Sequence, residues 1–297
     1  MHDTGTPPHD AGTSHGTGTP PHAAGEPTGP AWDPQQYLRH SGPRTRPFHD
    51  LLARIPEPPA RGRPVRIADL GCGAGNVTVL LAGRWPAARI TGYDNSPAML
   101  QAARAHPAGE PSGGHVDFVH ADIADWTPGE PFDLIVSNAA LQWVPGHARL
   151  FPSWVRALTP GGSLAVQVPG NGDAPSHVLL RELCSSARWR DRLRDAGRRT
   201  VDVLQPAEYL ERLTDLGCTV DAWETTYVHV LTGEDPVLDW IRGTGLRPVL
   251  TALAGDPAAE AEFLGAYRAL LREAYPPRPD GTVFPFRRVF VVATTPG

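Results

Sequence analysis

The residues best suited to holding a ligand form one glycine-rich stretch, Asp69-Leu70-Gly71-Cys72-Gly73-Ala74-Gly75-Asn76, directly after an apolar run. Glycine lets the backbone turn sharply and approach a ligand without a Cβ in the way. In open parallel sheets, ligands bind beyond the carboxyl ends of the strands, where such a loop would lie. We therefore expect a binding site lined by Asp69, Gly71, Gly73 and Gly75.

The stretch departs from the dinucleotide-binding pattern Gly-x-Gly-x-x-Gly. That pattern needs its third glycine at position 76, which is asparagine here, and the glycine falls at 75 instead. Asp69 is also a poor neighbour for a pyrophosphate but a good one for a cation. Both features disfavour a nicotinamide cofactor.

Two further aspartates follow predicted strands. Asp94 lies 19 residues after Gly75, where a carboxylate can accept hydrogen bonds from both hydroxyls of an adenosine ribose. Asp122 is followed by Ile123, so a carboxylate can bind an adenine amino group while the aliphatic side chain packs on the ring. Strand-end aspartates are common turn residues, but three of them around a Gly-x-Gly-x-Gly loop indicate a nucleoside site.

These side chains need a scaffold that brings strand ends together. Short apolar runs predict strands at 65–70, 89–93, 116–120, 132–137 and 163–168. Helices are predicted between them at 76–85, from 97 to about 106, and near 148–158. Such alternation indicates a parallel sheet with helices on both faces.

The C-terminal part has a different pattern. It predicts helices at 206–216, 236–253 and 257–275, and strands at 218–231 and 289–294. In the last helix one apolar face is formed by Phe263, Leu264, Tyr267, Leu270 and Leu271. We expect the C-terminal helices to be an insertion before the final strand, lying as a lid over the ligand edge of the sheet.

Composition excludes several kinds of chemistry. The chain has 297 residues, and all 27 of its basic residues are arginine. Without lysine there is no Schiff-base chemistry, no phosphate-loop NTPase site and no lysine general base. The net charge is −5, and Asp3, Asp10 and Glu26 contribute three of those charges. The rest is nearly neutral, which argues against a nucleic-acid partner.

Residues 1–30 contain no large apolar side chain, so we expect a disordered tail rich in Pro, Gly, Thr and His. No secretory signal and no membrane-spanning run is visible, which favours the cytoplasm and no membrane association. The three cysteines, Cys72, Cys184 and Cys218, are too far apart for a zinc site, and we expect no metal.

With these motifs in place, residues 65–169 resemble the class I S-adenosylmethionine-dependent methyltransferases. The resemblance implies a Rossmann-like, doubly wound, mostly parallel seven-stranded sheet and S-adenosyl-L-methionine as cofactor. It implies that Asp69 and the loop glycines lie near the methionine moiety, that Asp94 and Asn95 hold the ribose, and that Asp122 and Ile123 hold the adenine. The segment from Asn138 to Trp143 is similar to the one that closes over the sulfonium and meets the substrate.

Blocks outside the cofactor core are similar to the trans-aconitate 2-methyltransferases over nearly the whole chain after residue 30. They include RWPAARITGYDNSPAM, SNAALQW, TGLRP at 244–248, and FRRVFVV near the end. We divide the body, 31–297, into an N-terminal helical cap (31–64), a cofactor core (65–169), a substrate lid with later elements (170–283) and a last strand (284–297). The implied reaction is methyl-ester formation on one carboxylate of trans-aconitate.

Such an acceptor needs no general base, because a carboxylate with a pKa near 4 is already ionised. We therefore expect no catalytic residue in the acid–base sense, only alignment and exclusion of water. Arginine binds carboxylates with bidentate geometry, and Arg46, Arg247 and Arg288 stand in blocks that match the family. We expect a substrate site formed by Tyr37, Arg46, Trp143, Arg247 and Arg288 in a monomer.

Three alternatives stay open on the sequence. One is a small-molecule O- or N-methyltransferase of specialised metabolism, whose base-dependent acceptor would give a pH-dependent rate. Another is a nucleotide-binding oxidoreductase, against which Asn76 counts. The third is a cofactor-binding regulator that turns over no acceptor.

Overall fold

A computed structural model describes residues 41–105, 115–198 and 203–297, with side chains from Thr45 onward. The expected tail at 1–30 and Tyr37 lie outside these residues. The fold is built on one seven-stranded sheet, whose strands are β1 (Arg66–Leu70), β2 (Arg89–Asp94), β3 (His115–His120), β4 (Phe132–Asn138), β5 (Leu158–Pro169), β6 (Thr219–Leu231) and β7 (Thr282–Thr294). Their order across the sheet is β3-β2-β1-β4-β5-β7-β6.

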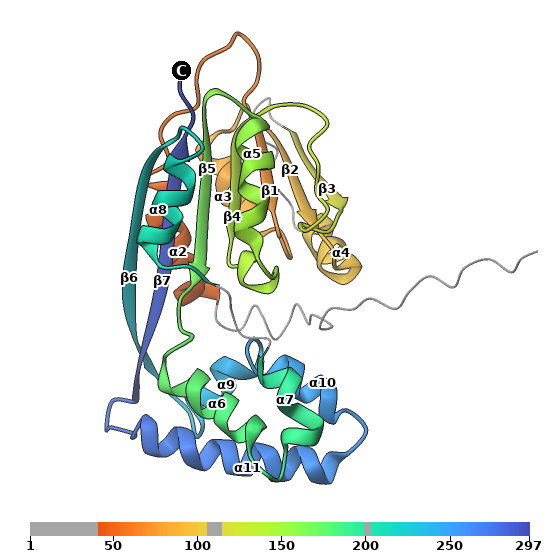
Figure 1. The fold of residues 1–297 in the computed structure, drawn as a ribbon, viewed down its shortest axis with the longest axis vertical. Coiled ribbons are helices and arrows are strands. Elements are labelled where there is room, and N and C mark those ends of the chain that lie inside the picture. The colour runs from red at the N-terminus through yellow and green to blue at the C-terminus, as the bar shows by residue number, and fades with distance from the viewer. Residues whose placement is uncertain (1–40, 106–114, 199–202) are drawn as a thin grey trace, which may run out of the picture.

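Strands β1 to β5 run parallel to one another, and β7 pairs antiparallel with both β5 and β6. The predicted Rossmann-like, mostly parallel seven-stranded fold is confirmed. Because the parallel strands share one direction, the ends of β1, β2 and β4 meet at one edge of the sheet (Figure 1). The glycine loop and Asp94 therefore come together at that edge, as the spacing predicts.

Helices cover both faces of the sheet. Helices α2 (Ser41–Leu52) and α3 (Asn76–Arg84) bury Phe48, Leu81 and Trp85 against one face. Helices α5 (Phe151–Arg156) and α8 (Pro206–Thr214) bury Trp154 and Tyr209 against the other. Helix α4 (Pro97–Ala105) packs on β2 and β3, and the short helices η1 (Leu141–Trp143) and η2 (His147–Leu150) connect β4 to α5.

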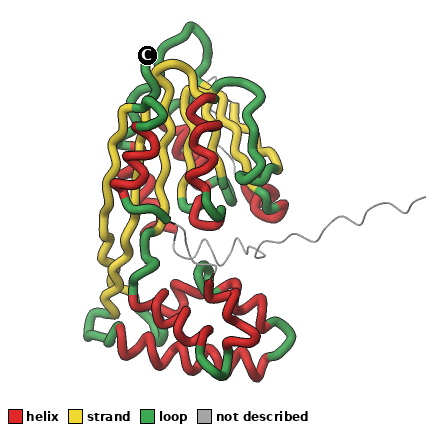
Figure 2. The backbone as a smooth tube through the Cα atoms, in the orientation of Figure 1, coloured by secondary structure: helices red, strands yellow, loops and turns green. Residues whose placement is uncertain are grey.

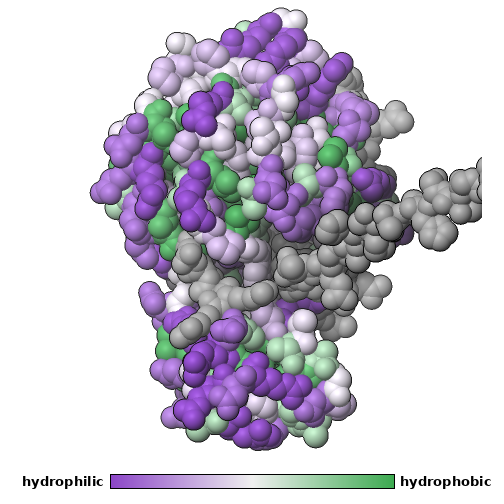
Figure 3. Space-filling view, turned by 45° about the vertical axis from the view of Figure 1, so that its right-hand side comes forward, coloured by the Kyte–Doolittle hydropathy of each residue, from purple (hydrophilic) through white to green (hydrophobic). Residues whose placement is uncertain are grey.

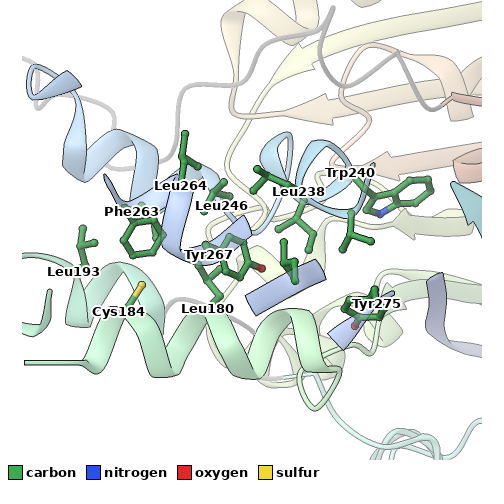
Figure 4. Packing of buried hydrophobic residues seen from close by; sticks show 14 of the residues in the cluster. Leu180, Cys184, Leu193, Leu238, Trp240, Leu246, Phe263, Leu264, Tyr267 and Tyr275 are labelled. Atoms are coloured by element: carbon green, nitrogen blue, oxygen red, sulfur yellow. The ribbon is translucent and has the colours of Figure 1, made fainter. Parts of the chain in front are cut away.

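Five helices form a separate layer beneath the carboxyl edge of the parallel strands, which we call the helical subdomain. They are α6 (Pro175–Ser185), α7 (Arg190–Arg198), α9 (Pro236–Arg242), α10 (Arg247–Leu253) and α11 (Pro257–Ala274) (Figures 1 and 2). Its own core includes Leu180, Leu246 and Phe263 (Figure 4). In the space-filling view the subdomain is narrower than the part of the molecule that holds the sheet (Figure 3).

Two tyrosine hydroxyls anchor the start of α6 inside the subdomain. The Tyr267 hydroxyl donates to the Ser176 carbonyl oxygen at 2.7 Å, and the Ser176 N–H donates to the Tyr275 hydroxyl at 3.1 Å. Ser176 is fully buried, and its N–H is one of the helix-start donors that have no acceptor within the helix, so the Tyr275 hydroxyl satisfies it; the Tyr267 hydroxyl adds a second tie at the Ser176 carbonyl. The segment that leaves β5 is thereby fixed onto α11.

The structure corrects the prediction of one helix over 236–253. Two helices, α9 and α10, are separated by Gly243–Leu246. Glycine is a poor helix former, and Pro248 takes the start of a helix because it lacks the N–H that an interior position must donate. Helices α6 and α7 were not predicted, and strands β5 and β7 begin earlier than the predicted 163 and 289.

None of the helices in the described part of the chain is long and apolar enough to cross a membrane.

A buried carboxylate ties the sheet to the segment before β1. Asp133 accepts hydrogen bonds from Arg63 at 2.7 and 3.0 Å, from the Arg66 N–H at 2.9 Å and from the Thr159 hydroxyl at 2.9 Å. Burial alone would raise its pKa, but these donors outweigh burial and lower the pKa of Asp133 below its usual range. Its stabilising effect is therefore present at neutral pH and is lost as pH falls through that lowered pKa.

We expect Asp133→Asn to lower the free energy of unfolding by about 2 kcal/mol at neutral pH, because the charge-assisted bonds from Arg63 are weakened. Urea unfolding followed by circular dichroism measures it. The difference from the original chain should shrink towards acid, where Asp133 is protonated in both states. A difference that stays constant down to acid pH would contradict this role for the charge.

Candidate functional site

The glycine loop is held against the neighbouring strand by its own backbone. The N–H groups of Gly71 and Cys72 both donate to the Tyr93 carbonyl oxygen, at 2.8 and 3.0 Å. Gly71, Gly73 and Gly75 all have positive φ (76°, 55° and 81°), a region that other residues rarely adopt. A Cβ built at Gly71 would lie 2.2 Å from the Ala140 Cβ, whereas one at Gly73 would meet nothing within 4 Å. Gly73 thus faces open space.

Asp69 ends up beneath the loop in a fully buried position. Its carboxylate accepts a hydrogen bond from the Thr78 hydroxyl at 2.7 Å. Burial raises the pKa of Asp69 to about 7, with a further increase from the charge of Asp94, while the Thr78 hydrogen bond opposes the shift. Asp69 is therefore poised to gain or lose a proton near neutral pH. Thr78, on the first turns of α3, was not predicted as part of the site.

Asp94 is fixed at the end of β2 by two backbone donors. The Gly73 N–H donates to one carboxylate oxygen at 2.9 Å and the Ser96 N–H to the other at 2.8 Å. Partial burial raises the pKa of Asp94, although these two bonds work in the opposite direction. Each oxygen retains a lone pair for a further donor, which two neighbouring hydroxyls can supply.

Asp122 and Asn95 lie side by side beyond the ends of β3 and β2. The Asn95 side-chain amide donates to Asp122 at 3.1 Å, and the Ala124 N–H donates to the other oxygen at 2.8 Å. Asp122 itself is exposed, while the neighbouring Ile123 is buried. An exposed acceptor beside an apolar surface suits a flat polar heterocycle.

The end of β4 supplies buried acceptors. The side-chain oxygens of Asn138 and Gln142 are buried, and no hydrogen-bond donor reaches them from the residues that the structure describes. Between them, Ala139 has a φ of 54°, a strained conformation for a residue with a side chain. Buried oxygens without donors at a strained strand end indicate a place where a ligand donates hydrogen bonds. Asn138 was predicted here; Gln142 and the strain were not.

These features fit the cofactor that the sequence resemblance implies. S-adenosylmethionine carries a sulfonium, an ammonium, two ribose hydroxyls and an adenine amino group, so it offers cations and donors. The edge of the sheet offers three carboxylates (Asp69, Asp94, Asp122) and the two buried side-chain oxygens of Asn138 and Gln142. Opposite charge and complementary hydrogen bonding therefore agree.

Two of the predicted arginines lie over aromatic rings on the face of the sheet covered by α2. The Arg46 guanidinium lies over the Tyr227 ring, 5.2 Å from its centroid, and that of Arg288 lies 4.5 Å from the centroid of Phe286. Tyr227 and Phe286 are register partners in the β6–β7 pair. Arg288 is buried, with 6% of its surface exposed. The Tyr227 hydroxyl donates to Asp50 at 2.5 Å.

The other predicted substrate residues lie on different elements. Trp143 ends η1, after β4, and is half-buried; Arg247 begins α10 in the helical subdomain and is half-buried as well. Tyr37 lies outside the described residues. Asp50 was not predicted, although it lies four residues after Arg46, a spacing that places two side chains on the same side of a helix.

Comparison with known proteins agrees with this geometry. A family model described as a methyltransferase domain matches residues 67–162. The chain is 66% identical to trans-aconitate 2-methyltransferase of Streptomyces coelicolor, over 88% of this chain and 86% of that protein. It is 52% identical to the protein of the same name from Rhodococcus jostii, over 87% of this chain and 97% of that protein.

Solved structures share the fold at low identity. The YcgJ protein from Bacillus subtilis aligns with a TM-score of 0.52 at 17% identity, over 84% of this chain and 99% of that one. The [4+2]-cyclase SpnF aligns with a TM-score of 0.51 at 18% identity, over 84% and 80%. A cyclase among these neighbours shows that the fold by itself does not decide the reaction. On the strength of its relatives, this chain is an S-adenosylmethionine-dependent enzyme that belongs to the trans-aconitate 2-methyltransferase family of class I methyltransferases.

Proposed function

We propose that this enzyme transfers a methyl group from S-adenosylmethionine to one carboxylate of trans-aconitate, giving a monomethyl ester. The observation that carries the proposal is the pair Arg46, from α2, and Arg288, from β7, over aromatic rings of the β6–β7 pair, in a chain whose relatives are named trans-aconitate 2-methyltransferase. Arginine binds carboxylates with bidentate geometry, and a tricarboxylate offers three of them.

The site residues divide between cofactor and acceptor. For the cofactor, we assign the ribose to Asp94 and Asn95, the adenine to Asp122 and Ile123, and the methionine moiety to Asp69, Asn138 and the glycine loop (Gly71, Gly73, Gly75). For the acceptor, we assign its carboxylates to Arg46, Arg247 and Arg288, with Tyr37 and Trp143 as neighbours.

The chemistry requires alignment rather than proton transfer. When bound, S-adenosylmethionine supplies an electrophilic methyl group on sulfur. The acceptor carboxylate is ionised at neutral pH, so no residue has to remove a proton before it attacks. The protein's contribution is to bring two molecules together in line and to keep water out. The arginines orient the acceptor by bidentate hydrogen bonds. The helical subdomain beneath the sheet edge acts as a lid over the cofactor and the acceptor.

The test is incubation of the purified chain with methyl-labelled S-adenosylmethionine and a panel of di- and tricarboxylates, amines and phenols. We expect label in an ester of trans-aconitate that mild base hydrolyses. Transfer only to amines, phenols or protein would refute the proposal. We further propose that the enzyme acts as a cytoplasmic monomer on this small molecule and does not bind nucleic acid.

The position of Asp69 predicts how cofactor binding depends on pH. Its pKa is about 7 in the free protein, because burial penalises the carboxylate. A cationic ligand favours the ionised form, so affinity for S-adenosylmethionine should rise between about pH 6 and pH 8, with release of a proton on binding. Titration calorimetry in buffers of different ionisation enthalpy measures both.

Asp69→Asn removes this charge and shows separately its effect on cofactor binding and its effect on the stability of the fold. Since the raised pKa means that ionised Asp69 destabilises the free protein, the stability it contributes is lost as pH rises from about 4 to about 7. The variant should therefore unfold at a higher temperature than the original chain at about pH 8, yet bind the cofactor more weakly and without the pH dependence. Unchanged pH dependence in the variant would assign the proton to another group.

A further inference from the structure

A histidine, His229, lies close enough to Arg46 and Arg288 for both charges to act on it, and it has no part in the assignments above. His229 follows Tyr227 on the same face of β6, because side chains two residues apart in a strand share a face. The centroid of its ring lies 4.9 Å from that of Trp240 of α9. The Trp240 ring also packs against Phe286, with 5.8 Å between the centroids, and the Arg288 guanidinium lies over this Phe286 ring. His229 is thus held where the sheet meets the helical subdomain.

The groups around this imidazole come from four elements. Helix α2 provides Arg46 and β7 provides Arg288, the two charges that act on the imidazole; β6 provides Tyr227, and α9 packs the uncharged indole of Trp240 on the ring. The Tyr227 hydroxyl already occupies one oxygen of Asp50, at 2.5 Å. The charges of Arg288 and Arg46 both act on His229 to favour its neutral form, so both guanidinium groups are felt at the imidazole.

This environment holds the imidazole neutral. Half-burial lowers the pKa of His229 below its ordinary value of 6.5, and the charges of Arg288 and Arg46 lower it further. A neutral histidine beside two guanidinium groups is able to gain a proton once an anion neutralises them. Ordinary packing of a strand histidine against Trp240 would not require positive neighbours.

We propose that Arg46, His229 and Arg288 form the subsite for a carboxylate of the acceptor that is not methylated, and that His229 takes up a proton as this carboxylate binds. This inference rests on the proposed function, because it needs an acceptor with more than one carboxylate. His229 then determines specificity, because an acceptor without a second carboxylate at this subsite cannot form the interaction with protonated His229.

The sign of the pH dependence follows from linkage. Binding that raises the pKa of a group is favoured when that group is protonated. The acceptor dissociation constant should therefore rise with pH between the pKa of His229 in the free enzyme and its higher pKa in the complex, by up to tenfold per pH unit. Outside that interval it should be flat.

The experiment is calorimetric titration of trans-aconitate into the full chain saturated with S-adenosylhomocysteine, the demethylated cofactor. Buffers of different ionisation enthalpy at about pH 7 report the number of protons taken up. We expect net uptake in the original chain and, in His229→Gln, loss of most of that uptake with a roughly tenfold weaker dissociation constant, the effect of one hydrogen bond to a charged group. Uptake that remains in His229→Gln belongs to another group that titrates near neutral pH, with Asp69 as the first candidate.

The matched control is His115→Gln, which removes an exposed histidine on β3 and should leave proton uptake unchanged. Binding of S-adenosylhomocysteine by His229→Gln checks that the variant is folded. If the variant does not fold, the pH dependence of the acceptor dissociation constant in the original chain still tests the inference. Equal proton uptake in the original chain and His229→Gln, or a flat pH profile, would overturn the inference. If trans-aconitate binds with His229-dependent uptake but is not methylated, the proposed function fails and the subsite stands.

Discussion

Gly71→Ala is expected to abolish cofactor binding and to lower the free energy of unfolding by about 3 kcal/mol. The added Cβ would lie 2.2 Å from the Ala140 Cβ and 3.2 Å from the Ile123 side chain, so the loop and the segment after β4 must separate. Overpacking of this kind costs about 1 to 3 kcal/mol, and the positive φ adds roughly 1 kcal/mol for any residue with a side chain. Displacing this loop also moves the backbone that follows Asp69.

Gly73→Ala provides the matched comparison within the same loop. Its φ is also positive, but a Cβ there meets nothing within 4 Å. We expect only the backbone penalty of about 1 kcal/mol in unfolding, with a loss of cofactor affinity if the cofactor fills the open space in front of it. Thermal unfolding and calorimetry with S-adenosylhomocysteine measure both variants. Equal stability losses in the two variants would show that the contact with Ala140 is not decisive.

Asp94→Ala is expected to weaken S-adenosylmethionine binding by roughly a hundredfold to a thousandfold. Hydrogen bonds to a charged group contribute about 1.5 to 3 kcal/mol each, and we assign two ribose hydroxyls to this carboxylate. The substitution also removes the acceptor that holds the Gly73 and Ser96 N–H groups. Asp94→Asn keeps one carbonyl oxygen and should lose less affinity. Equilibrium binding of the cofactor measures the series.

Two controls separate this effect from general damage. Asp117→Ala removes an exposed carboxylate from β3, where it pairs with His115, and should leave cofactor affinity unchanged. Arg247→Ala should chiefly raise the KM for the acceptor while cofactor binding stays normal. If Asp94→Ala and Arg247→Ala weakened cofactor binding equally, the division of the site into cofactor and acceptor parts would be wrong.

The positions of the residues that we assign to the cofactor could be predicted because their signals are local. The loop from Asp69 to Gly75 requires glycines for its positive φ angles, Asp94 is the last residue of β2, and Asp122 follows β3. Parallel topology then brings the ends of separate strands to one edge. A sequence pattern that determines both the backbone conformation and the strand direction is enough to place such residues.

The acceptor side and the helical subdomain could not be predicted in the same way. The contact of Arg46 with Tyr227 joins α2 to β6 across most of the chain, and no local pattern encodes it. The break between α9 and α10 was missed because Val237, Leu238 and Ile241 continue into Val249 with the periodicity of one apolar face. Periodicity reports which side is buried and does not report where a helix stops.

The construction of the helical subdomain has a consequence for how the chain folds. Its helices come from two separate segments, with α6 and α7 following β5, and α9 to α11 lying between β6 and β7. Helix α6 packs on α11, and α7 packs on α10, although β6 intervenes in the sequence. Helical units usually fold quickly because their contacts are local, but these contacts close long loops. The subdomain should therefore form late, after the antiparallel pairing of β6 with β7 has brought its two halves together.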